Sequence, residues 1–219
     1  MPNKLNLLIV GAGGFGREVH EMLWDVFSPD EYQFKGFLAN DDQTLRAAGL
    51  VDVGFFGDPT QYSPAPDDRF VMAVGYMDAR RSLYESITNR GGKFASFVHP
   101  KSLVASTAKI GEGAVIYPFA IVSNASELDE CIHLNYFASV GHDCKLGKYC
   151  LMAPYATLNG FVTLDNEVYV STHGTVAPGK SVGYQSKVSA NSAAMQDVPD
   201  GAIVFGVPGR QVAGVTRSS

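Results

Sequence analysis

Residues 104–147 have the sequence VASTAKIGEGAVIYPFAIVSNASELDECIHLNYFASVGHDCKLG, in which every sixth side chain from Val104 to Leu146 is aliphatic. The same spacing extends without a break from Val98 to Val188. Its positions are Val98, Val104, Ile110, Ile116, Val122, Leu128, Leu134, Val140, Leu146, Met152, Leu158, Leu164, Val170, Val176, Val182 and Val188. A period of six matches neither an α-helix, with 3.6 residues per turn, nor a simple β-strand, with a period of two.

A second set of positions, four residues after each aliphatic one, contains mostly small side chains, as at Ala108, Ala138 and Cys144. Glycine often follows the aliphatic residue, as at Gly141 and Gly147. These features predict a parallel β-helix of hexapeptide repeats, in which the aliphatic residue points inward, the small residue lies where the interior is narrow, and glycine serves the corner. Three hexads make one coil, so residues eighteen apart stack, and the pattern predicts about five coils.

The first 95 residues have a different pattern, typical of a small α/β domain with a parallel sheet. The expected strands are Leu5–Val10, Gln33–Leu38 and Phe70–Val74, and the expected helices are Arg17–Phe27 and Met77–Thr88. A segment of this length holds only half of a doubly wound dinucleotide-binding fold. We therefore expect two domains, a half-Rossmann domain over residues 1–95 and the β-helix over residues 96–219. The first domain should bind a mononucleotide or a nucleotide-sugar rather than NAD.

The sequence GAGGFG at residues 11–16 follows the first expected strand and matches the pattern GxGxxG. Glycines in this pattern let the backbone approach a phosphate at the N-terminus of the following helix. Asn40 and Asp41 come at the end of the second expected strand, where an acidic side chain can hold a ribose hydroxyl. We expect the nucleotide to bind through Gly13, Gly14 and neighbouring amides, helped by Asn40 or Asp41. A solvated turn is the alternative for the three polar residues there, Asn40, Asp41 and Asp42.

Charge and cysteine usage exclude several classes of function. The formal net charge is -5 and no run of Lys or Arg occurs, so nucleic acid is not an expected partner. The apolar run Leu5–Val10 is too short for a signal peptide or a membrane span, so we expect a cytoplasmic protein. The three cysteines Cys131, Cys144 and Cys150 form no CxxC pair, and we expect buried core residues rather than disulfides or a metal site.

Six segments from both halves of the chain together resemble a known family. They are LIVGAGGFGREV (Leu8–Val19), KGFLANDD (Lys35–Asp42), VMAVGYMDARR (Val71–Arg81), FVHPKSLVASTAKIGEGAVI (Phe97–Ile116), HLNYFASVGHDCKLG (His133–Gly147) and VFGVPGR (Val204–Arg210). The chain resembles the sialic-acid O-acetyltransferase-type sugar acyltransferases, which include bacterial nucleotide-linked 4-amino-sugar N-acetyltransferases. This resemblance implies a homotrimer of left-handed β-helices, with acetyl-CoA along the β-helix between subunits and the nucleotide in the N-terminal domain.

The resemblance also implies binding residues. Those for the nucleotide-sugar are Gly13, Gly14, Phe15, Asn40, Asp41, Gly75 and Asn135, and those for acetyl-CoA are Leu151, Gly160, Thr172 and Ala190. The N–H of Gly160 is expected to face the thioester oxygen. The chain departs from the family pattern at Leu151, where many relatives have a second histidine near CoA. Ala190 lies in a Ser-Ala-Asn-Ser segment where relatives often have a glycine-rich one.

Acetyl transfer to an amine needs a base that takes a proton and a donor that stabilises the oxyanion. Histidine suits the base because its pKa lies near neutrality. His142 is the best candidate, since the third hexad position points outward and Asp143 next to it can stabilise the protonated imidazole. In the resembled family the motif histidine is the base and the acidic neighbour tunes it. The other histidines are His20, expected at the surface, His99, expected to be structural, and His133 and His173, which could line the site.

The expected function is transfer of an acetyl group from acetyl-CoA to the amino group of a nucleotide-linked amino sugar. A 4-amino-4,6-dideoxy sugar for bacterial surface glycan synthesis is the expected acceptor. O-acetylation of a sugar hydroxyl, as on a sialic acid, is the nearest alternative because the same base serves both reactions. A non-catalytic trimeric binding scaffold is a third possibility, against which the His142–Asp143 pair argues. The short first domain argues against an NAD-linked oxidoreductase.

Overall fold

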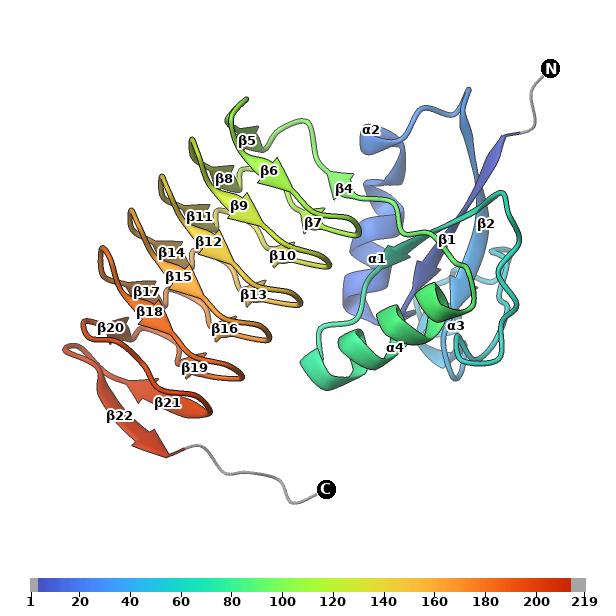
Figure 1. Ribbon diagram of the computed structural model, residues 1–219. Coiled ribbons are helices and arrows are strands. Elements are labelled where there is room, and N and C mark those ends of the chain that lie inside the picture. The colour runs from blue at the N-terminus through green and yellow to red at the C-terminus, as the bar shows by residue number, and fades with distance from the viewer. Residues whose placement is uncertain (1–3, 214–219) are drawn as a thin grey trace. The chain divides into compact units, whose positions relative to one another are not determined.

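The structure is a computed structural model that describes residues 4–213 (Figure 1). The chain divides between Phe97 and Val98 into two compact units. The longest described helix has 13 residues, whereas about 20 apolar residues are needed to cross a bilayer. Accordingly, none of the helices within residues 4–213 has the length and apolar character of a membrane span.

The N-terminal unit is built on a three-stranded parallel sheet. Its elements are β1 (Leu5–Val10), α1 (Gly14–Glu21), α2 (Leu23–Val26), β2 (Tyr32–Leu38), α3 (Gln43–Ala47), β3 (Asp68–Met72) and α4 (Met77–Asn89). The strand order is β2-β1-β3. The central strand β1 is almost continuously apolar, and residues 7–10 are completely buried, as expected for a parallel strand with both faces covered. The expected α/β domain with a parallel sheet is confirmed.

Several details of this unit differ from the sequence-based expectation. The helix expected over Arg17–Phe27 begins earlier and is broken at Met22, whose ψ of 7° is not helical. Val19 and Leu23 of this segment are buried, whereas the apolar Trp24 is 47% exposed. The third strand lies two residues earlier than predicted. α3 was not expected, because five residues are too few to show a helical period.

Asp68, at the start of β3, is a buried carboxylate at the centre of a polar network. Its Oδ1 accepts hydrogen bonds from Lys35 Nζ at 2.9 Å and Asn6 Nδ2 at 3.1 Å. Its Oδ2 accepts from the Tyr62 hydroxyl at 2.7 Å and the Ala65 N–H at 2.9 Å. Burial opposes ionisation, but the donors outweigh it and lower the pKa of Asp68. The edge strand β3 therefore begins at an ionised, buried carboxylate, that of Asp68, both oxygens of which accept hydrogen bonds.

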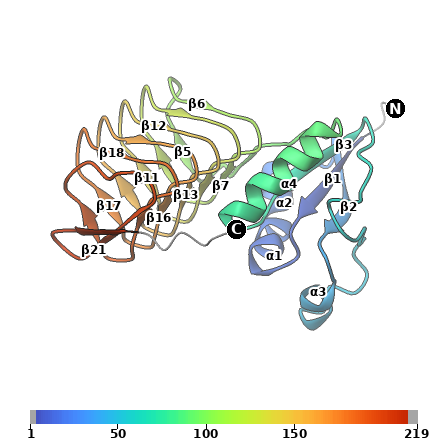
Figure 2. The same ribbon diagram turned by 60° about the horizontal axis from the view of Figure 1, so that its bottom comes forward.

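The C-terminal unit is a β-solenoid of about six turns, seen from two sides in Figures 1 and 2. Its strands are β4 (Phe97–Val98), β5 (Leu103–Val104), β6 (Lys109–Ile110), β7 (Val115–Ile116), β8 (Ile121–Val122), β9 (Glu127–Leu128), β10 (His133–Leu134), β11 (Ser139–Val140), β12 (Lys145–Leu146), β13 (Leu151–Met152), β14 (Thr157–Leu158), β15 (Thr163–Leu164), β16 (Tyr169–Val170), β17 (Thr175–Val176), β18 (Ser181–Val182), β19 (Lys187–Val188), β20 (Ala193–Ala194), β21 (Ala202–Phe205) and β22 (Arg210–Ala213). From β4 to β20 they pair in parallel with the strand eighteen residues away and form three sheets, one containing β10 and β13, one β11 and β14, and one β12 and β15. The hexapeptide prediction is confirmed.

The aliphatic side chains line the interior of the solenoid. From Ile116 to Val188 every member of the six-residue pattern is at most 3% exposed. The pattern continues past Val188, since Ala194 in β20 is also buried. The solenoid is therefore longer than the predicted five coils. The prediction stopped at Val188 because position 194 is an alanine rather than a larger aliphatic residue.

From Ala114 onward the small side chains of the second set are buried as well, and the polar ones have hydrogen-bond partners. Cys144 Sγ lies 3.1 Å from the carbonyl oxygen of Asn159, and Cys150 Sγ lies 3.0 Å from that of Asp165. Burial raises the pKa of the Cys144 thiol. All three cysteines are free and buried, which confirms the expectation of core residues.

The corners of the solenoid share one backbone conformation. Every sixth residue from Gly113 to Asn191 has a positive φ, between 53° and 71°. Only two of these residues are glycines, so the corner geometry, rather than residue type, imposes the left-handed conformation. Stacking of the coils produces two exposed corners that we name by their contents. The aromatic corner contains Phe119, Phe137, Tyr155 and His173, and the histidine corner contains His142 together with Ala125, Asp143, Phe161 and Gly179.

Candidate active site

His142 and Asp143 lie at the turn between β11 and β12 and point outward, as the hexad position predicted. Their side chains are 51% and 40% exposed, and His142 Nδ1 lies 2.8 Å from Asp143 Oδ2. If Nδ1–H donates to the carboxylate, the neutral ring keeps its lone pair on Nε2. Within residues 4–213, Nε2 has no hydrogen-bond partner. The pair thus presents a proton acceptor to the outside of the solenoid.

Gly160 stacks on this pair from the next coil, eighteen residues along the chain. A Cβ built on Gly160 would lie 2.5 Å from both Cε1 and Nε2 of His142, so the imidazole occupies the space of the missing side chain. The N–H of Gly160 makes no hydrogen bond within the described part of the chain, whereas its carbonyl accepts one from Gly179 N–H at 2.9 Å. The corner therefore places one unused backbone donor next to one unused imidazole nitrogen.

Phe161 completes the histidine corner, and sequence analysis missed it. Its ring is edge-to-face with the His142 ring, with centroids 5.0 Å apart and planes at 90°. Its side chain is largely exposed. The eighteen-residue spacing that stacks position 160 on position 142 also places position 161 beside His142, so this neighbour could have been found from the repeat.

The other residues expected in the β-helix site do not lie at this corner. Asn135 precedes the turn at the opposite end of β11, where its Oδ1 accepts the Tyr136 N–H at 2.7 Å. Thr172 and Ala190 stack eighteen residues apart at the aromatic corner. Leu151 in β13 is 8% exposed. Within one chain, therefore, these four residues do not lie next to His142.

The remaining histidines have other surroundings. His99 and His133 are both buried, and His99 Nδ1 accepts the N–H of Lys101 at 3.1 Å. His173 stacks on Tyr155 at the aromatic corner, with ring centroids 4.8 Å apart. His20 is partly buried rather than on the open surface, packs 4.6 Å from the Phe34 ring, and has its pKa lowered by burial.

The glycines at residues 11–16 have three distinct environments. Gly11 has a φ of 111°, and a Cβ there would collide with the carbonyl of Ala73 in the neighbouring segment. A Cβ on Gly16 would collide with the carbonyl of Gly11, so this glycine lets α1 pack closely on the end of β1. Gly13 and Gly14 are exposed, with nothing within 4 Å of the position of a Cβ. The first and third glycines thus shape the turn, and the space above the second stays open to a ligand.

A cavity of about 540 Å³ lies at the carboxyl ends of the three strands. Gly11 after β1, Asn40 after β2 and Val74 after β3 all line it. In open α/β sheets ligands bind at this edge, where the strand order reverses. Phe15 and Gly75, two further expected residues, lie at the same edge, in the first turn of α1 and three residues after the end of β3. Asp41 uses its Oδ1 to accept the Gln43 N–H at 3.0 Å.

Sequence analysis missed part of this cavity's lining. The missed residues are Asp58, Pro59 and Thr60 from a loop, and Ala79, Ser82 and Leu83 from α4. Asp58 Oδ1 accepts the Thr60 N–H at 2.7 Å, which lowers the pKa of Asp58. The segment has no regular period or motif, and only the fold brings it to the strand ends.

Comparison with known proteins relates this geometry to a known family. Residues 6–87 match the PglD N-terminal domain. The chain is 28% identical over 212 residues to the GDP-perosamine N-acetyltransferase of Escherichia coli O157:H7, covering 93% of this chain and 95% of that protein. Its structure matches the acetyltransferase domain of PglB from Neisseria gonorrhoeae FA1090 in complex with acetyl coenzyme A, with a TM-score of 0.85, 27% identity, and coverage of 96% and 100%. The chain is an acetyl-CoA-dependent sugar N-acetyltransferase that resembles the PglD-type hexapeptide-repeat acetyltransferases.

The fold of this acetyltransferase is also that of PerB from Caulobacter crescentus, solved in complex with CoA and GDP-perosamine. The TM-score is 0.84 with 23% identity, over 97% of this chain and 98% of that one. At this identity the likeness concerns the fold alone. It extends over both units, the α/β unit and the solenoid.

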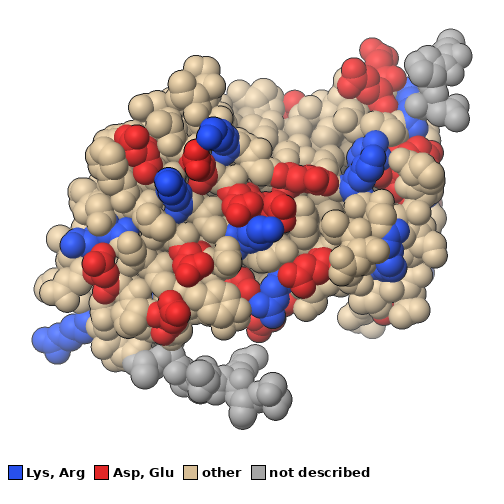
Figure 3. Space-filling view, in the orientation of Figure 1, with Lys and Arg blue, Asp and Glu red and all other residues tan. Residues whose placement is uncertain are grey.

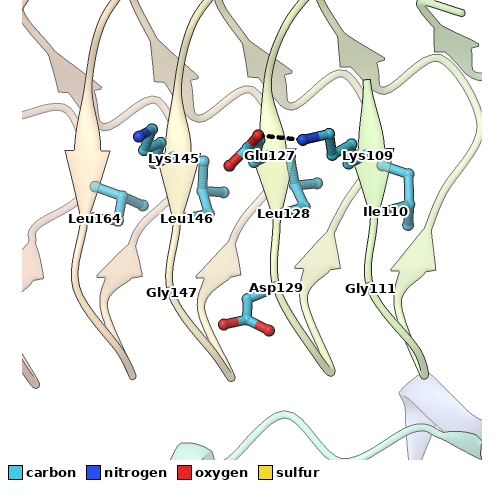
Figure 4. A pocket seen from close by; sticks show the side chains of 10 residues that line it. All are labelled: Lys109, Ile110, Gly111, Glu127, Leu128, Asp129, Lys145, Leu146, Gly147 and Leu164. Atoms are coloured by element: carbon cyan, nitrogen blue, oxygen red, sulfur yellow. Dashed lines mark hydrogen bonds and ion pairs between the residues drawn. The ribbon is translucent and has the colours of Figure 1, made fainter. Parts of the chain in front are cut away.

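The acetyltransferase has a second hollow, of about 490 Å³, on the solenoid sheet that contains β6, β9, β12 and β15 (Figure 4). Lys109, Glu127 and Lys145 form a row along it, and Lys109 Nζ lies 2.7 Å from Glu127 Oε1. Sequence analysis missed this row, although its eighteen-residue spacing is visible in the repeat. Acidic and basic side chains are interspersed on this face (Figure 3), so it has no field of a single sign.

Proposed function

We propose that this protein transfers the acetyl group of acetyl-CoA to the amino group of a nucleotide-linked 4-amino sugar, specifically a 4-amino-4,6-dideoxy sugar used in bacterial surface glycans. The observation that carries the proposal is the His142–Asp143 pair beside the unused N–H of Gly160. The relative that matches nearly the whole chain is named as an N-acetyltransferase of GDP-perosamine. That name supports N-acetylation over the O-acetylation alternative.

His142 acts as the general base in this proposal. The neutral amine attacks the thioester carbonyl carbon, and the electrons of the C=O bond move onto oxygen as the C–N bond forms. His142 Nε2 accepts a proton from the attacking nitrogen, while Asp143 holds the ring through Nδ1–H and stabilises the imidazolium. When the intermediate collapses, the C–S bond breaks and the leaving sulfur takes the proton from His142.

Gly160 stabilises the oxyanion in the same scheme. A backbone N–H aimed at the developing charge is effective because it is already in place and need not reorient. The Gly160 N–H has no competing acceptor within residues 4–213. Its position directly beside the His142 ring puts the donor and the base within reach of one carbonyl group.

The N-terminal unit binds the nucleotide at the strand-end cavity. Gly13 and Gly14 form the N-terminus of α1, and the space where their side chains would lie is open. The helix dipole and the backbone N–H groups at a helix N-terminus favour a phosphate. Asn40 lines the same cavity and is exposed at the end of β2. Phe15, Asp41 and Gly75 complete the proposed nucleotide-sugar contacts.

The working form is a homotrimer with acetyl-CoA between subunits. Asn135, Leu151, Thr172 and Ala190 are separated from the histidine corner within one chain. They can serve the same reactants as His142 only if a neighbouring subunit presents them. A solenoid packed with side chains also has no interior room for a cofactor, so an intersubunit cleft is the natural site.

A thiol-release assay tests the function. Purified protein is given acetyl-CoA and a panel of GDP-, UDP- and dTDP-linked amino sugars, with the corresponding hydroxy sugars and free amino sugars as controls. We expect CoA release only with a nucleotide-linked amino sugar, and an amide in the product by mass spectrometry. Transfer to a hydroxyl, or equal rates with free sugars, would overturn the proposal.

A further inference from the structure

Phe161 is a large apolar residue in a place that core packing does not explain. Its side chain is 61% exposed, and its φ of 62° lies in the left-handed region that bulky residues avoid. The equivalent residues on the other coils at this corner are Ala125, Asp143 and Gly179, which are small or polar. The solenoid therefore needs no phenylalanine here, and its aromatic ring requires another reason.

The contacts of Phe161 are with the proposed base. Its ring meets the His142 ring edge-to-face at 5.0 Å, an arrangement in which aromatic pairs attract each other. Its backbone N–H donates to the carbonyl oxygen of His142 at 2.9 Å. Three neighbours thus contact the imidazole of His142. The Asp143 carboxylate lies at Nδ1, the Cα of Gly160 lies next to the ring, and the Phe161 ring meets it edge-to-face.

An exposed histidine would otherwise be free to change rotamer. The His142 side chain is 51% exposed, and exposed side chains move between rotamers on a picosecond-to-nanosecond scale. Asp143 alone does not stop this motion, since its carboxylate is itself exposed at a corner. A rigid ring set at right angles to the imidazole restricts the rotation that would carry Nε2 away from Gly160.

We propose that Phe161 is a positioning residue, which holds the His142 imidazole over Gly160 with Nε2 in reach of the reacting amine. This inference rests on the proposed role of His142 as the base. The effect is on the orientation of the base rather than on binding of either substrate. It should therefore change kcat more than KM.

Three variants test the inference kinetically. Phe161→Ala should lower kcat by about threefold to tenfold, the scale of one aromatic pair, with both KM values within about twofold. Phe161→Tyr keeps the ring and should retain wild-type kcat. Trp24→Ala is the control, since Trp24 is also an exposed aromatic residue but lies in α2 of the N-terminal unit, a helix that contains none of the proposed binding residues. It should leave kcat unchanged, and a similar loss in this control would overturn the inference.

A second measurement follows the imidazole directly and does not depend on activity. In protein with isotope-labelled histidine, the His142 ring signal is assigned by its loss in His142→Ala. Phe161→Ala should shift this signal and bring its line width close to that of a mobile side chain. An unchanged signal overturns the inference, and so does a rise in KM without a fall in kcat. If the wild-type protein transfers no acetyl group, the proposed function fails, while the signal still decides whether Phe161 orders His142.

Discussion

The imidazole of His142 fills the space in which a side chain of residue 160 would lie, 2.5 Å from the position of its Cβ. Gly160→Ala should therefore displace the ring and lower kcat by about tenfold to a hundredfold, the cost of a misplacement on the order of 1 Å. Stability should change little, because the half-exposed ring can swing into solvent. Steady-state kinetics and thermal unfolding of the same preparation check both parts.

A double-mutant cycle separates this effect from a displacement of the backbone N–H of residue 160, which alanine retains. If the added methyl acts only through the ring, Gly160→Ala should cost nothing further in a His142→Ala background. Full additivity of the two losses would contradict the steric explanation.

His142→Ala should lower kcat by about a hundredfold to ten-thousandfold, the usual contribution of a general base. Its fold should persist, since the outward side chain contributes nothing to the solenoid interior. Asp143→Asn should have a smaller effect, because it removes the charge next to the ring but not the proton acceptor. Wild-type activity in His142→Ala would move the base elsewhere, and His133 and His173 would be tested next.

Gly13→Leu should raise the KM for the nucleotide-sugar far more than that for acetyl-CoA. Apart from its chain neighbours, no heavy atom of residues 4–213 lies within 4 Å of a Cβ at this position, so the side chain obstructs the proposed phosphate site without disturbing the fold. Gly16→Ala is the contrasting variant. Its Cβ would collide with the backbone of Gly11, and we expect a lowered melting temperature. Equal changes in both KM values for Gly13→Leu would count against a nucleotide at this loop.

Asp68→Asn should destabilise the N-terminal unit by about 3 kcal/mol, since it leaves the Lys35 ammonium without its buried partner. Because the pKa of Asp68 is lowered in the folded state, its stabilisation is complete above the unfolded value of about 4 and is lost as the pH falls through the folded value. The difference between wild type and variant should thus shrink on acidification below about pH 4.

The adjacent Asp67 supplies the control for this prediction. Its carboxylate accepts a hydrogen bond from Asn6 Nδ2 at 2.9 Å and is more exposed than that of Asp68. Asp67→Asn should cost less than about 1 kcal/mol. Chemical denaturation at several pH values measures both variants, and equal losses for the two would refute the role given to the buried network.

The protein should be a trimer at micromolar concentration. The reason is the separation of Asn135, Thr172 and Ala190 from the histidine corner in a single chain. Light scattering coupled to size exclusion gives the mass directly. A monomer with full acetyltransferase activity would rule out an active site shared between subunits.

Sequence reasoning succeeded where one residue type must recur at fixed spacing. The six-residue pattern predicted the solenoid and the outward direction of His142, because the interior admits only apolar side chains along its length. The same period could have placed Phe161 beside His142, because residue 160 stacks on residue 142 and residue 161 follows it. The eighteen-residue row at Lys109 and Glu127 was visible in the same way.

Sequence reasoning failed where contacts depend on how irregular segments close in space. The loop at Asp58 and Thr60 lines the strand-end cavity only because the sheet brings it there. The carboxylate of Asp68 has no mark in the sequence that distinguishes it from the partly buried Asp67, yet only Asp68 is buried with four donors. The proposed oxyanion donor and the proposed base rest on the family resemblance and on the eighteen-residue stacking, not on local composition.

The row of left-handed corners, one every six residues from Gly113 to Asn191, restricts how the length of this unit can change. Removing a single residue would shift every later aliphatic side chain out of the interior and every later corner out of its conformation. Removing eighteen would shorten the stack by one whole coil and leave all remaining neighbours matched. Insertions and deletions in the solenoid should consequently be tolerated in whole coils, or as loops that leave and rejoin the chain at one corner.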